Sequence, residues 1–458
     1  MKPAPNFFPS GVERDRLTSL KSYKRLYEGD QYAVLGLHEI IKNQYENKKD
    51  LVYISNPIPA RVVDFYADFV VGDLDKMVIK ASDINTEVET FIAEVVYEND
   101  LKEMISDIGG GQSEYGYAAL LGWLDELGKY HIEIIPQDQY FPQSDGSIVI
   151  ATYKRDPAAS ELSKDLLLLT KHYSVVNQKL VIERKAWKTD ERGVITESYP
   201  MEKMAALLGK TEIKETETID IDDTCIRQID NTIKNDYGFG KSDLADIVVP
   251  LAEINERVTQ MSTQFLKNLD AKMQLPADMF NEDGKLEVFE AIAVTKDGGE
   301  AKYITNENPL MTDAREHVAS QMKMISFSTA VPMFELLKSA MPERVESLRI
   351  QLFGAIRRAD RKRGKIKRAI NDMFRIGFQL KDIKYDKDVR IDFADILPVD
   401  ENLQANTESI KVTSGLTSKK SAMIRMEGYS SEEADEELKR IADEDKIAGI
   451  DIKNPPQL

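Results

Sequence analysis

The spacing of apolar residues changes along the chain, and each spacing predicts a different kind of element. Over residues 55–72, apolar side chains recur every three or four positions between a proline and Gly72, which is typical of a helix with one buried face. A second helix is expected over residues 85–108, and the glycine run at 109–111 is expected to interrupt it. The chain therefore opens with helices.

Runs that favour strands follow this helical part. Residues 114–142 hold two apolar stretches with a turn near Gly128 between them. Further short strands are expected over residues 148–154, 180–187 and 224–229. Since no obvious linker separates these elements, we expect one α+β region.

Long helices dominate the next part. From Pro250 the apolar residues step by three or four, and a helix of about 25 residues ending at Pro276 would reach roughly 38 Å. A β-hairpin is expected over residues 286–305, turning at Asp297, and a second amphipathic helix follows it. The pattern predicts a helix, a small β module and a returning helix.

The last part begins with a third long helix, expected over residues 343–377. A strand is expected from Val389, and a helical tail follows it. In that tail, residues 430–433 have the spacing of a capping box, in which Ser and Glu bond each other's backbone N–H groups. The tail is acidic, and we expect it to be peripheral.

Composition narrows the class of protein. The 458 residues are 42% hydrophobic, which suffices for more than one buried core. With 61 basic and 79 acidic residues, the net charge is −18, the opposite of the basic surface expected for tight nucleic-acid binding. The single cysteine, Cys225, excludes an intramolecular disulfide and a thiolate-rich zinc site, which fits assembly in a reducing compartment.

Neither a signal peptide nor a membrane span is expected. The N-terminus lacks a continuous apolar stretch, and no run approaches the roughly 18 apolar residues that a transmembrane helix needs. The four histidines are scattered and form no HExxH motif. We therefore expect a soluble protein with no membrane partner.

One motif points toward an enzyme. Residues Gly238 to Ser242, GFGKS, match the end of the GxxxxGK[ST] loop, whose backbone N–H groups, Lys and hydroxyl hold phosphate and Mg²⁺. Asn235 occupies the place of the first glycine, and no apolar run ending in Asp or Glu follows to hold the magnesium. The alternative is a tight turn before a helix, with Ser242 as N-cap and Asp243 in the first turn. We favour the turn and keep a P-loop-type ATPase as a rival function.

Other catalytic patterns are weaker. Asp220, Asp222 and Asp223 form a carboxylate cluster, but in so acidic a chain such a cluster is more often a solvated loop. Ser113 follows GGGQ and does not lie in a GxSxG elbow. We therefore expect no catalytic residue, no metal site, no cofactor and no enzymatic activity.

The run from Arg357 to Arg368 is the one strongly cationic stretch. Its eight basic residues accompany a single acidic one, Asp360. One interpretation is a ring of charge that faces DNA. The other is a solvated helix face, or a partner for acidic groups of a neighbouring subunit, and we favour this second interpretation.

Five stretches, in order, resemble the portal proteins of tailed bacteriophages, which form a ring at one capsid vertex. They span nearly the whole chain, and each alone is degenerate. They are SYKRLYEGDQ from Ser22, ISNPIPARVVDFYADFVVGD from Ile54, EYGYAALLGWLDELGKYHIEIIPQDQYFP from Glu114, YGFGKSDLADIVVPLAEIN from Tyr237 and DFADILPVDENLQANTESIKVTSGLTSKKSAMIRM from Asp392.

The resemblance implies an α+β portal fold assembled as a homo-oligomeric ring, usually of twelve subunits. It implies a wing with α/β structure, long stem helices, a small β-containing clip and a helical crown. The implied parts are the first wing segment at 1–245, the stem helix at 246–275, the clip at 276–308, the returning stem helix at 309–328, the tunnel loop at 329–342, the wing helix and strand at 343–398 and the crown at 399–458.

The implied function is a channel through which double-stranded DNA is packaged and ejected. The resemblance implies a virion protein of the capsid portal vertex, assembled in the host bacterial cytoplasm. Its implied partners are the terminase large subunit, the major capsid and scaffold proteins, and head-completion or adaptor proteins. A structural capsid or adaptor protein without a channel remains a second rival.

Positions in this scheme suggest residues for two surfaces. We expect DNA contacts in the channel from Lys323, Lys338 and Arg344, and docking of terminase or connector proteins at the clip residues Lys285, Glu287, Asp297 and Lys302. The expected tunnel loop departs from the family, since it contains no glycine where the family often has many. An acidic ring would suit sliding DNA, because each Lys or Arg that neutralises a phosphate adds affinity.

Overall fold

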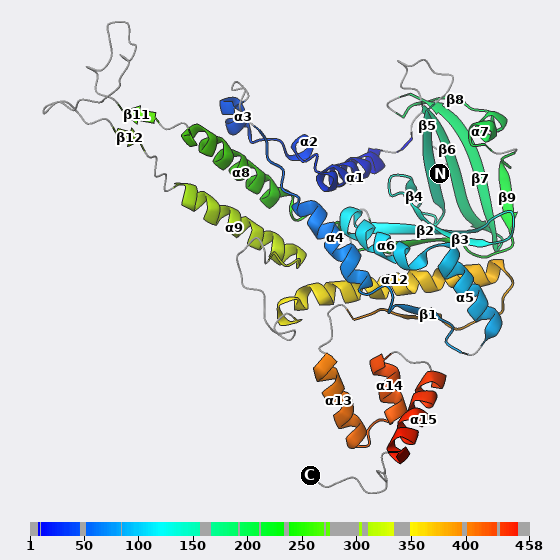
Figure 1. Cartoon of the computed structure of the whole chain (residues 1–458). Helices are drawn as coiled ribbons and strands as arrows, with labels where there is room; N and C mark the ends of the chain where they lie inside the picture. The colour runs from blue at the N-terminus through cyan, green and yellow to red at the C-terminus, as the bar shows by residue number, and fades with distance from the viewer. Residues whose placement is uncertain are drawn as a thin grey trace, which may run out of the picture. The chain divides into compact units, whose positions relative to one another are not determined.

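The computed structural model describes most of the chain, which folds as two units. The first comprises residues 1–341 and 351–396, and the second residues 342–350 and 397–458. The described residues are 8–9, 11–45, 52–83, 85–155, 166–190, 193–209, 212–232, 238–269, 272–274, 302–304, 310–333, 349–395, 401–427 and 431–447. Helices and strands are mixed in an α+β fold, as expected (Figure 1).

Eight of the described helices of the first unit lie before its strands, between them or after the α8–α9 pair. They are α1 (Gly11–Glu28), α2 (Tyr32–Leu35), α3 (Glu39–Tyr45), α4 (Ile58–Val71), α5 (Thr86–Glu98), α6 (Leu101–Tyr115), α7 (Met201–Leu207) and α12 (Phe353–Leu380). Helix α4 matches the predicted helix, and Gly72 ends it with a φ of 72°. Its apolar face, including the fully buried Val62 and Tyr66, points into the core.

The second predicted helix is broken at a different place from the one expected. The break lies at Asn99 and Asp100, where Asp100 takes a left-handed φ of 44°. Helix α6 then runs straight through the three glycines. Gly109 lets α6 approach α4 closely, because a Cβ there would lie 3.2 Å from the carbonyl oxygen of Tyr66. The glycines therefore serve helix packing and not helix termination.

Two antiparallel sheets lie beside these helices. The smaller has the order β10 (Ile226–Asp230), β2 (Tyr117–Leu124), β3 (Tyr130–Ile135), and Gly128 forms its predicted turn. The larger contains β4 (Tyr140–Pro142), β5 (Ile148–Arg155), β6 (Leu166–Val176), β7 (Lys179–Thr189) and β8 (Ile195–Ser198), with β9 (Thr216–Ile219) paired to β7. Strand β6, which the sequence patterns did not predict, lies between β5 and β7.

Two long helices pack side by side in the first unit, α8 (Val248–Leu269) and α9 (Leu310–Thr329). Leu251 and Ile254 of α8 share a buried cluster with Ile325 of α9. The helix α8 ends before Pro276, since the strand β11 (Lys272–Gln274) follows it and pairs with β12 (Lys302–Ile304). The rest of the predicted hairpin over 286–305 lies outside the described residues.

Helix α12 packs against the small sheet and carries the cationic run. It starts at Phe353, later than predicted, and residues 334–348 before it lie outside the described part. The predicted strand after it is β13 (Arg390–Asp392), which pairs with β1 (Val78–Lys80). Tyr130 of β3 donates a hydrogen bond to the carbonyl of Met373 and so fixes the helix against the sheet.

The described residues of the second unit include the helices α13 (Glu401–Thr413), α14 (Lys419–Glu427) and α15 (Ser431–Ile447). The predicted capping box falls at the start of α15, and its residue 430 lies outside the described residues. Helix α15 carries eight acidic and three basic residues, which agrees with the acidic tail described from the sequence. Within the described residues of the chain, no helix is both long enough and apolar enough to span a membrane.

Candidate functional site

The loop that leads from β10 into α8 passes very close to the end of α6. A Cβ at Gly116 would lie 2.1 Å from the carbonyl oxygen of Gly240, and a Cβ at Gly240 would lie 1.9 Å from the oxygen of Gly116. The N–H of Asn231 also bonds the Gly116 carbonyl at 2.7 Å. Only glycine fits at both crossing positions.

The described part of the same loop departs from a phosphate-binding loop and supports the turn that we favour. Ser242 is buried, and its hydroxyl lies 2.6 Å from the carbonyl oxygen of Glu114, to which it donates. The hydroxyl of Ser242 also accepts from the N–H of Leu244, so Ser242 caps a turn, while α8 begins only at Val248. Lys241 pairs with Asp246 at 2.5 Å. The hydroxyl is thus bonded within the protein and the amine lies in a surface ion pair, and α8 does not start directly after them as a phosphate loop requires.

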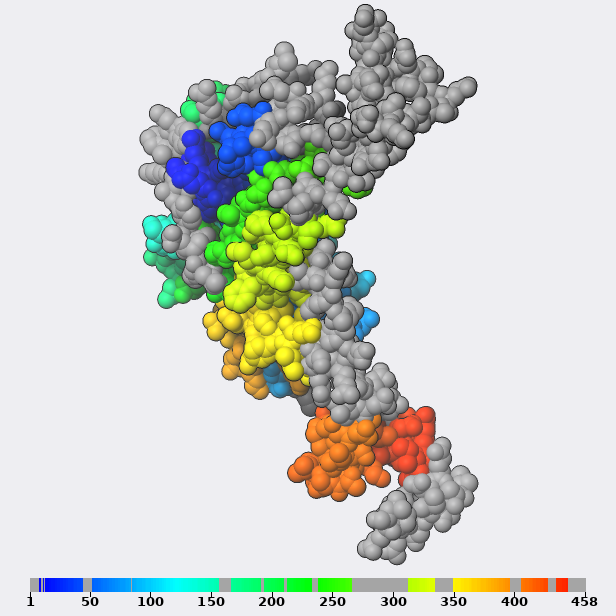
Figure 2. All heavy atoms as spheres, turned by 90° about the vertical axis from the view of Figure 1, so that its left-hand side faces the viewer, coloured from blue at the N-terminus to red at the C-terminus, as the bar shows by residue number. Residues whose placement is uncertain are grey.

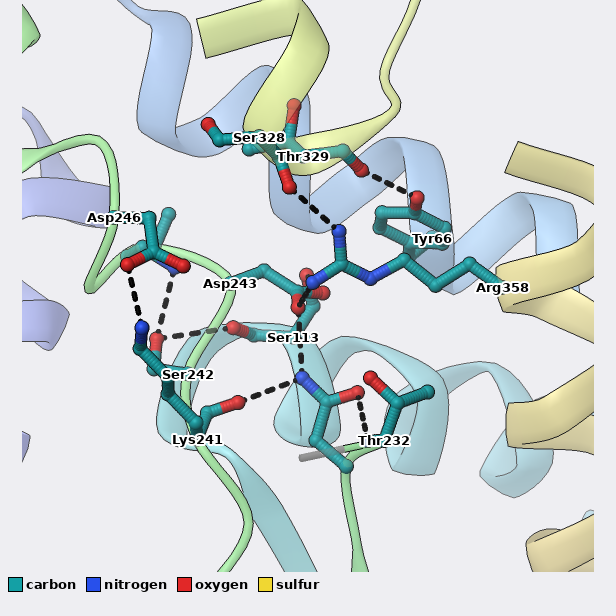
Figure 3. Close-up of polar contacts among 12 residues, drawn as sticks. Tyr66, Ser113, Thr232, Lys241, Ser242, Asp243, Asp246, Ser328, Thr329 and Arg358 are labelled. Carbon is teal, nitrogen blue, oxygen red and sulfur yellow. Dashed lines mark hydrogen bonds and ion pairs between the residues drawn. The ribbon is translucent and has the colours of Figure 1, made fainter. Parts of the chain in front are cut away.

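Asp243 is a buried hub and not the first-turn residue that was predicted (Figure 3). Its Oδ1 accepts from Asn231 Nδ2 at 2.7 Å and from Arg358 Nη2 at 2.8 Å. Its Oδ2 accepts from Ser113 Oγ at 2.8 Å and from Lys362 Nζ at 3.0 Å. Both carboxylate oxygens are therefore satisfied by two donors each, as a buried charge requires.

The charges of this junction stabilise one another. Burial alone would raise the pKa of Asp243, but Lys362 and Arg358 outweigh it and hold that pKa below its ordinary value. Burial lowers the pKa of Lys362, whose side chain is fully enclosed and lies 4.7 Å from the centre of the Tyr66 ring. The Asp243 carboxylate beside it acts in the opposite direction and favours the charged form of Lys362.

The junction also holds the end of α9. Arg358 donates from Nη1 to the carbonyl of Ser328 at 3.0 Å. The hydroxyl of Tyr66 donates to the carbonyl of Thr329 at 2.6 Å, and Thr329 itself is buried. One set of contacts therefore ties α4, α6, α9, α12 and the loop before α8 together (Figure 3). The junction therefore positions these helices relative to one another.

The structure corrects the interpretation of the cationic run on α12. Besides Arg358 and Lys362, three of its members bond carbonyl groups of the same chain: Arg363 to Val70, Lys365 to Asn231 and Lys367 to Ile391. These five side chains are committed to contacts within the chain, so the run as a whole is neither a solvated face nor a ring of charge toward DNA. The three remaining members, Arg357, Arg361 and Arg368, are exposed.

Sequence reasoning missed the junction although a signal was present. Ala355, Ala359, Lys362 and Ile366 follow one another at steps of three or four and are all buried, so Lys362 stands in the apolar stripe of α12. A lysine in such a stripe needs a buried anion. Ser113, which had been set aside as a nucleophile, is part of the same cluster.

Two of the seven predicted surface residues lie within the described part of the chain. Lys323 is exposed on α9, and Lys302 lies in β12 opposite Gln274. Lys338, Arg344, Lys285, Glu287 and Asp297 lie outside the described residues. The structure brings none of these together into one described site.

The carboxylate cluster at 220–223 is engaged in local contacts. Asp223 pairs with Arg227 and accepts a hydrogen bond from the N–H of Cys225. Asp220 pairs with Lys179. Among the described residues, no group of three or more His, Cys, Asp or Glu side chains is placed to hold a metal ion.

Large apolar side chains remain exposed on and beside the α8–α9 pair. They include Phe265 on α8, Met324 and Phe327 on α9, and Phe353 at the start of α12. Phe327 is 92% exposed. The last turns of α9 and the first of α12 lie side by side on one face, where Gly354 and Ala330 approach each other (Figure 2). We therefore treat this face as the candidate interaction surface.

The junction joins helices through buried charges, and large apolar side chains are exposed on α8, α9 and the start of α12. The chain belongs to the phage portal protein family: the family model described as phage portal protein, SPP1 Gp6-like, matches residues 12–449. This confirms the resemblance drawn from the sequence.

Further comparisons give more distant similarities. No curated protein sequence matches the chain. One similar solved structure is the virion of a native gene transfer agent particle, with a TM-score of 0.45 and 10% identity, covering 93% of this chain and 96% of that one. A second is the neck of an empty gene transfer agent particle computed with C6 symmetry, with a TM-score of 0.47, 11% identity and the same coverage.

Proposed function

We propose that the protein forms a ring at one capsid vertex, through which double-stranded DNA is packaged and ejected. In this proposal it is a structural protein of the virion without enzymatic activity, assembled in the host bacterial cytoplasm beside capsid and scaffold proteins. The clip, residues 276–308, docks the terminase large subunit and later the head-completion proteins. Membership of the portal family supports this proposal.

The observation that carries the proposal is the α8–α9 pair. These helices bury one side against each other and residues of α4, yet expose Met324 and Phe327 on the other. Such side chains on an isolated subunit are explained if a neighbouring subunit covers them. In a ring, repetition of this contact would build a wall of paired helices around a channel.

The net charge of the chain is consistent with a channel in which DNA slides. A net charge of −18 per subunit disfavours lasting contacts with phosphate groups. The exposed Lys323 on α9 is the one proposed DNA contact within the described residues whose side chain is placed. It lies one turn before Phe327, so the proposal places it where the subunit contact borders the channel, and the acidic Glu316 and the uncharged Ser320 precede it on the same face of the helix. The wall would then be mixed in charge and would allow DNA to slide.

Electron microscopy of the purified full-length protein tests this proposal. We expect end-on views of rings with a central hole, most often with twelve subunits. Compact particles without a hole, or monomers at every concentration, would exclude the portal function and favour a channel-less capsid or adaptor protein.

A matched pair of variants tests the surface that we assign. Phe327→Asp should leave the subunit folded, because the side chain is exposed, but should prevent ring formation. Tyr97→Asp places the same charge at a similarly exposed aromatic residue on α5 and should leave the rings intact. Rings of normal abundance with Phe327→Asp would show that this face of α9 is not a subunit contact.

A further inference from the structure

Helix α12 presents a line of arginines that the buried junction does not use. Arg357, Arg361 and Arg368 are exposed, and at 100° per residue they lie within about 40° of one another around the helix. The fully buried Ala359 and Ile366 lie on the opposite side of α12. These three arginines, here called the arginine stripe, therefore point away from the core of the first unit.

The arginine stripe is unpaired and open. Among the described residues, neither Arg361 nor Arg368 has a partner in a hydrogen bond or an ion pair, and Arg357 contacts only the ring of Phe353. Between Arg361 and Arg368 stands Gly364, where an added Cβ would meet nothing within 4 Å. Because each guanidinium carries five N–H donors, the stripe suits a partner that presents anionic oxygens.

Two kinds of anion fit such donors, the phosphates of DNA and the carboxylates of a protein. The exposed Asp360 borders the stripe, about 60° from Arg357 around the helix. It would repel a phosphate backbone, which carries no positive charge of its own. A protein helix with charges of both signs can meet the arginines and Asp360 together. The stripe therefore favours a protein partner.

Helix α15 has the complementary charge. Helix α12 contains nine basic and two acidic residues, whereas α15 contains eight acidic and three basic residues. Among the described helices, none has a larger excess of positive charge than α12 or of negative charge than α15. The exposed Glu436 and Asp443 are seven residues apart, which places them about 10.5 Å apart along α15. Arg361 and Arg368 have the same spacing on α12.

The two helices match in charge when they run parallel. The facing positions are then Arg361 with Glu436, Gly364 with Lys439, and Arg368 with Asp443. The lysine falls where the glycine leaves room, one turn from Asp360. Both signs of charge on α12 thus find an opposite charge on α15.

We propose that the arginine stripe of α12 binds helix α15 of a second copy of this chain. The described part of a single chain leaves Arg361 and Arg368 unpaired, which is why we assign α15 to a neighbour. The contact is heterologous, since a basic helix meets an acidic one, and repetition of a heterologous contact can close a ring. This inference rests on the ring proposed above.

Charge reversal in the full-length protein tests the contact. Arg361→Glu and Glu436→Arg each bring like charges together, so each alone should raise the concentration at which half of the chains form rings by about tenfold. An equimolar mixture of the two variants should restore the natural value. In an alternating ring every stripe then meets an α15 of opposite charge, and native mass spectrometry should find the two variants in equal numbers.

The control is Lys384→Glu, at an exposed lysine beyond the end of α12, which should assemble as the natural protein does. Normal rings from Arg361→Glu would overturn the inference and leave the portal function standing. If those rings also lost affinity for DNA, the stripe would be a DNA contact instead.

The double variant Arg361→Glu/Glu436→Arg shows which copy supplies α15. Rings restored by the double variant and by the mixture support a contact between copies. Rings restored by the double variant but not by the mixture would place the pair within one chain and overturn the inference. Failure of both to restore rings would overturn it too, because the two residues would not be partners. Absence of rings from the unmodified protein would overturn the portal function itself, and this inference with it.

Discussion

At the scale of single residues, Asp243 is the residue on which the buried junction depends. Arg358 and Lys362 both rely on its carboxylate, and Lys362 has no exposure to water. Replacement by Asn would leave the buried Lys362 and the partly buried Arg358 without an anion. We expect Asp243→Asn to lower the free energy of unfolding by about 3–5 kcal/mol. Urea denaturation followed by circular dichroism measures this change.

The neighbouring Asp246 supplies the control. Its pair with Lys241 is largely exposed, so Asp246→Asn should cost less than about 1 kcal/mol. Equal losses for the two variants would show that the buried junction contributes no more than a surface ion pair.

Acid should weaken the same junction. The pKa of Asp243 is lower in the folded chain than in the unfolded chain, so its contribution is complete at neutral pH. That contribution is lost as the pH falls below the ordinary aspartate value of about 4 and through the folded value. Urea midpoints measured between pH 7 and pH 3 should fall more steeply for the natural protein than for Asp243→Asn. Parallel curves would contradict this assignment.

Cys225 offers a second residue-scale prediction. Burial raises the pKa of its thiol to about 12, and Asp223 adds to the effect. At pH 8 the thiolate fraction is then on the order of one in ten thousand, and the thiolate is the reactive form. Iodoacetamide should leave the folded protein unlabelled after an hour and should label it fully in urea, as mass spectrometry would show. Rapid labelling without urea would place the thiol at the surface.

At the scale of elements, the close crossing of α4 and α6 should make two adjacent glycines of α6 respond differently to substitution. A Cβ at Gly109 would press on the backbone oxygen of Tyr66 at 3.2 Å, whereas one at Gly110 would meet Ala67 at an ordinary 3.6 Å. We expect Gly109→Ala to destabilise the protein by about 1–3 kcal/mol through overpacking. Gly110→Ala should be neutral or stabilise it by about 0.5–1 kcal/mol, because alanine favours helix.

Thermal unfolding of both variants measures this difference. The opposite signs expected at neighbouring positions exclude a general effect of alanine in α6. If both substitutions stabilise the protein, the two helices can move apart without cost, and the close packing at Gly109 is not a constraint.

The sequence predicted elements well where one periodicity decided them. The stripe of α4, the turn at Gly128 and the pair α8 and α9 follow from local spacing alone. Strand β6 was missed because its apolar residues continue without a clean alternation, and its place between β5 and β7 depends on long-range pairing. The break predicted at the glycines of α6 was wrong, because these glycines allow the close approach of α4, which no local pattern shows.

The buried junction was less predictable than the elements. Its residues lie at positions 66, 113, 231, 243, 358 and 362, and no local pattern joins them. Lys362 in an apolar stripe showed that an anion was needed, but its partner could not be identified among 79 acidic residues. Composition showed only how many charges exist, and the fold selects which are paired.

At the scale of the whole molecule, the net charge gives a prediction about DNA. Rings carrying −18 per subunit should not retain linear double-stranded DNA at about 0.15 M salt, since few phosphates are neutralised. Gel-shift titrations across salt concentrations should show weak binding with a shallow dependence on salt. Tight binding with a steep dependence would mean that a basic surface outside the described residues dominates.

The crossing of Gly116 and Gly240 also bears on how this protein can evolve. Two backbones that approach so closely leave no room for a side chain, so a relative that keeps this crossing must keep glycine at both positions. One of the two is the second glycine of GFGKS. We therefore expect glycine at position 240 to recur among relatives for steric reasons, and a hydroxyl at position 242 because Ser242 bonds the carbonyl of Glu114. Where a lysine stands between them, a search for nucleotide-binding motifs would select a protein whose glycine has nothing to do with phosphate.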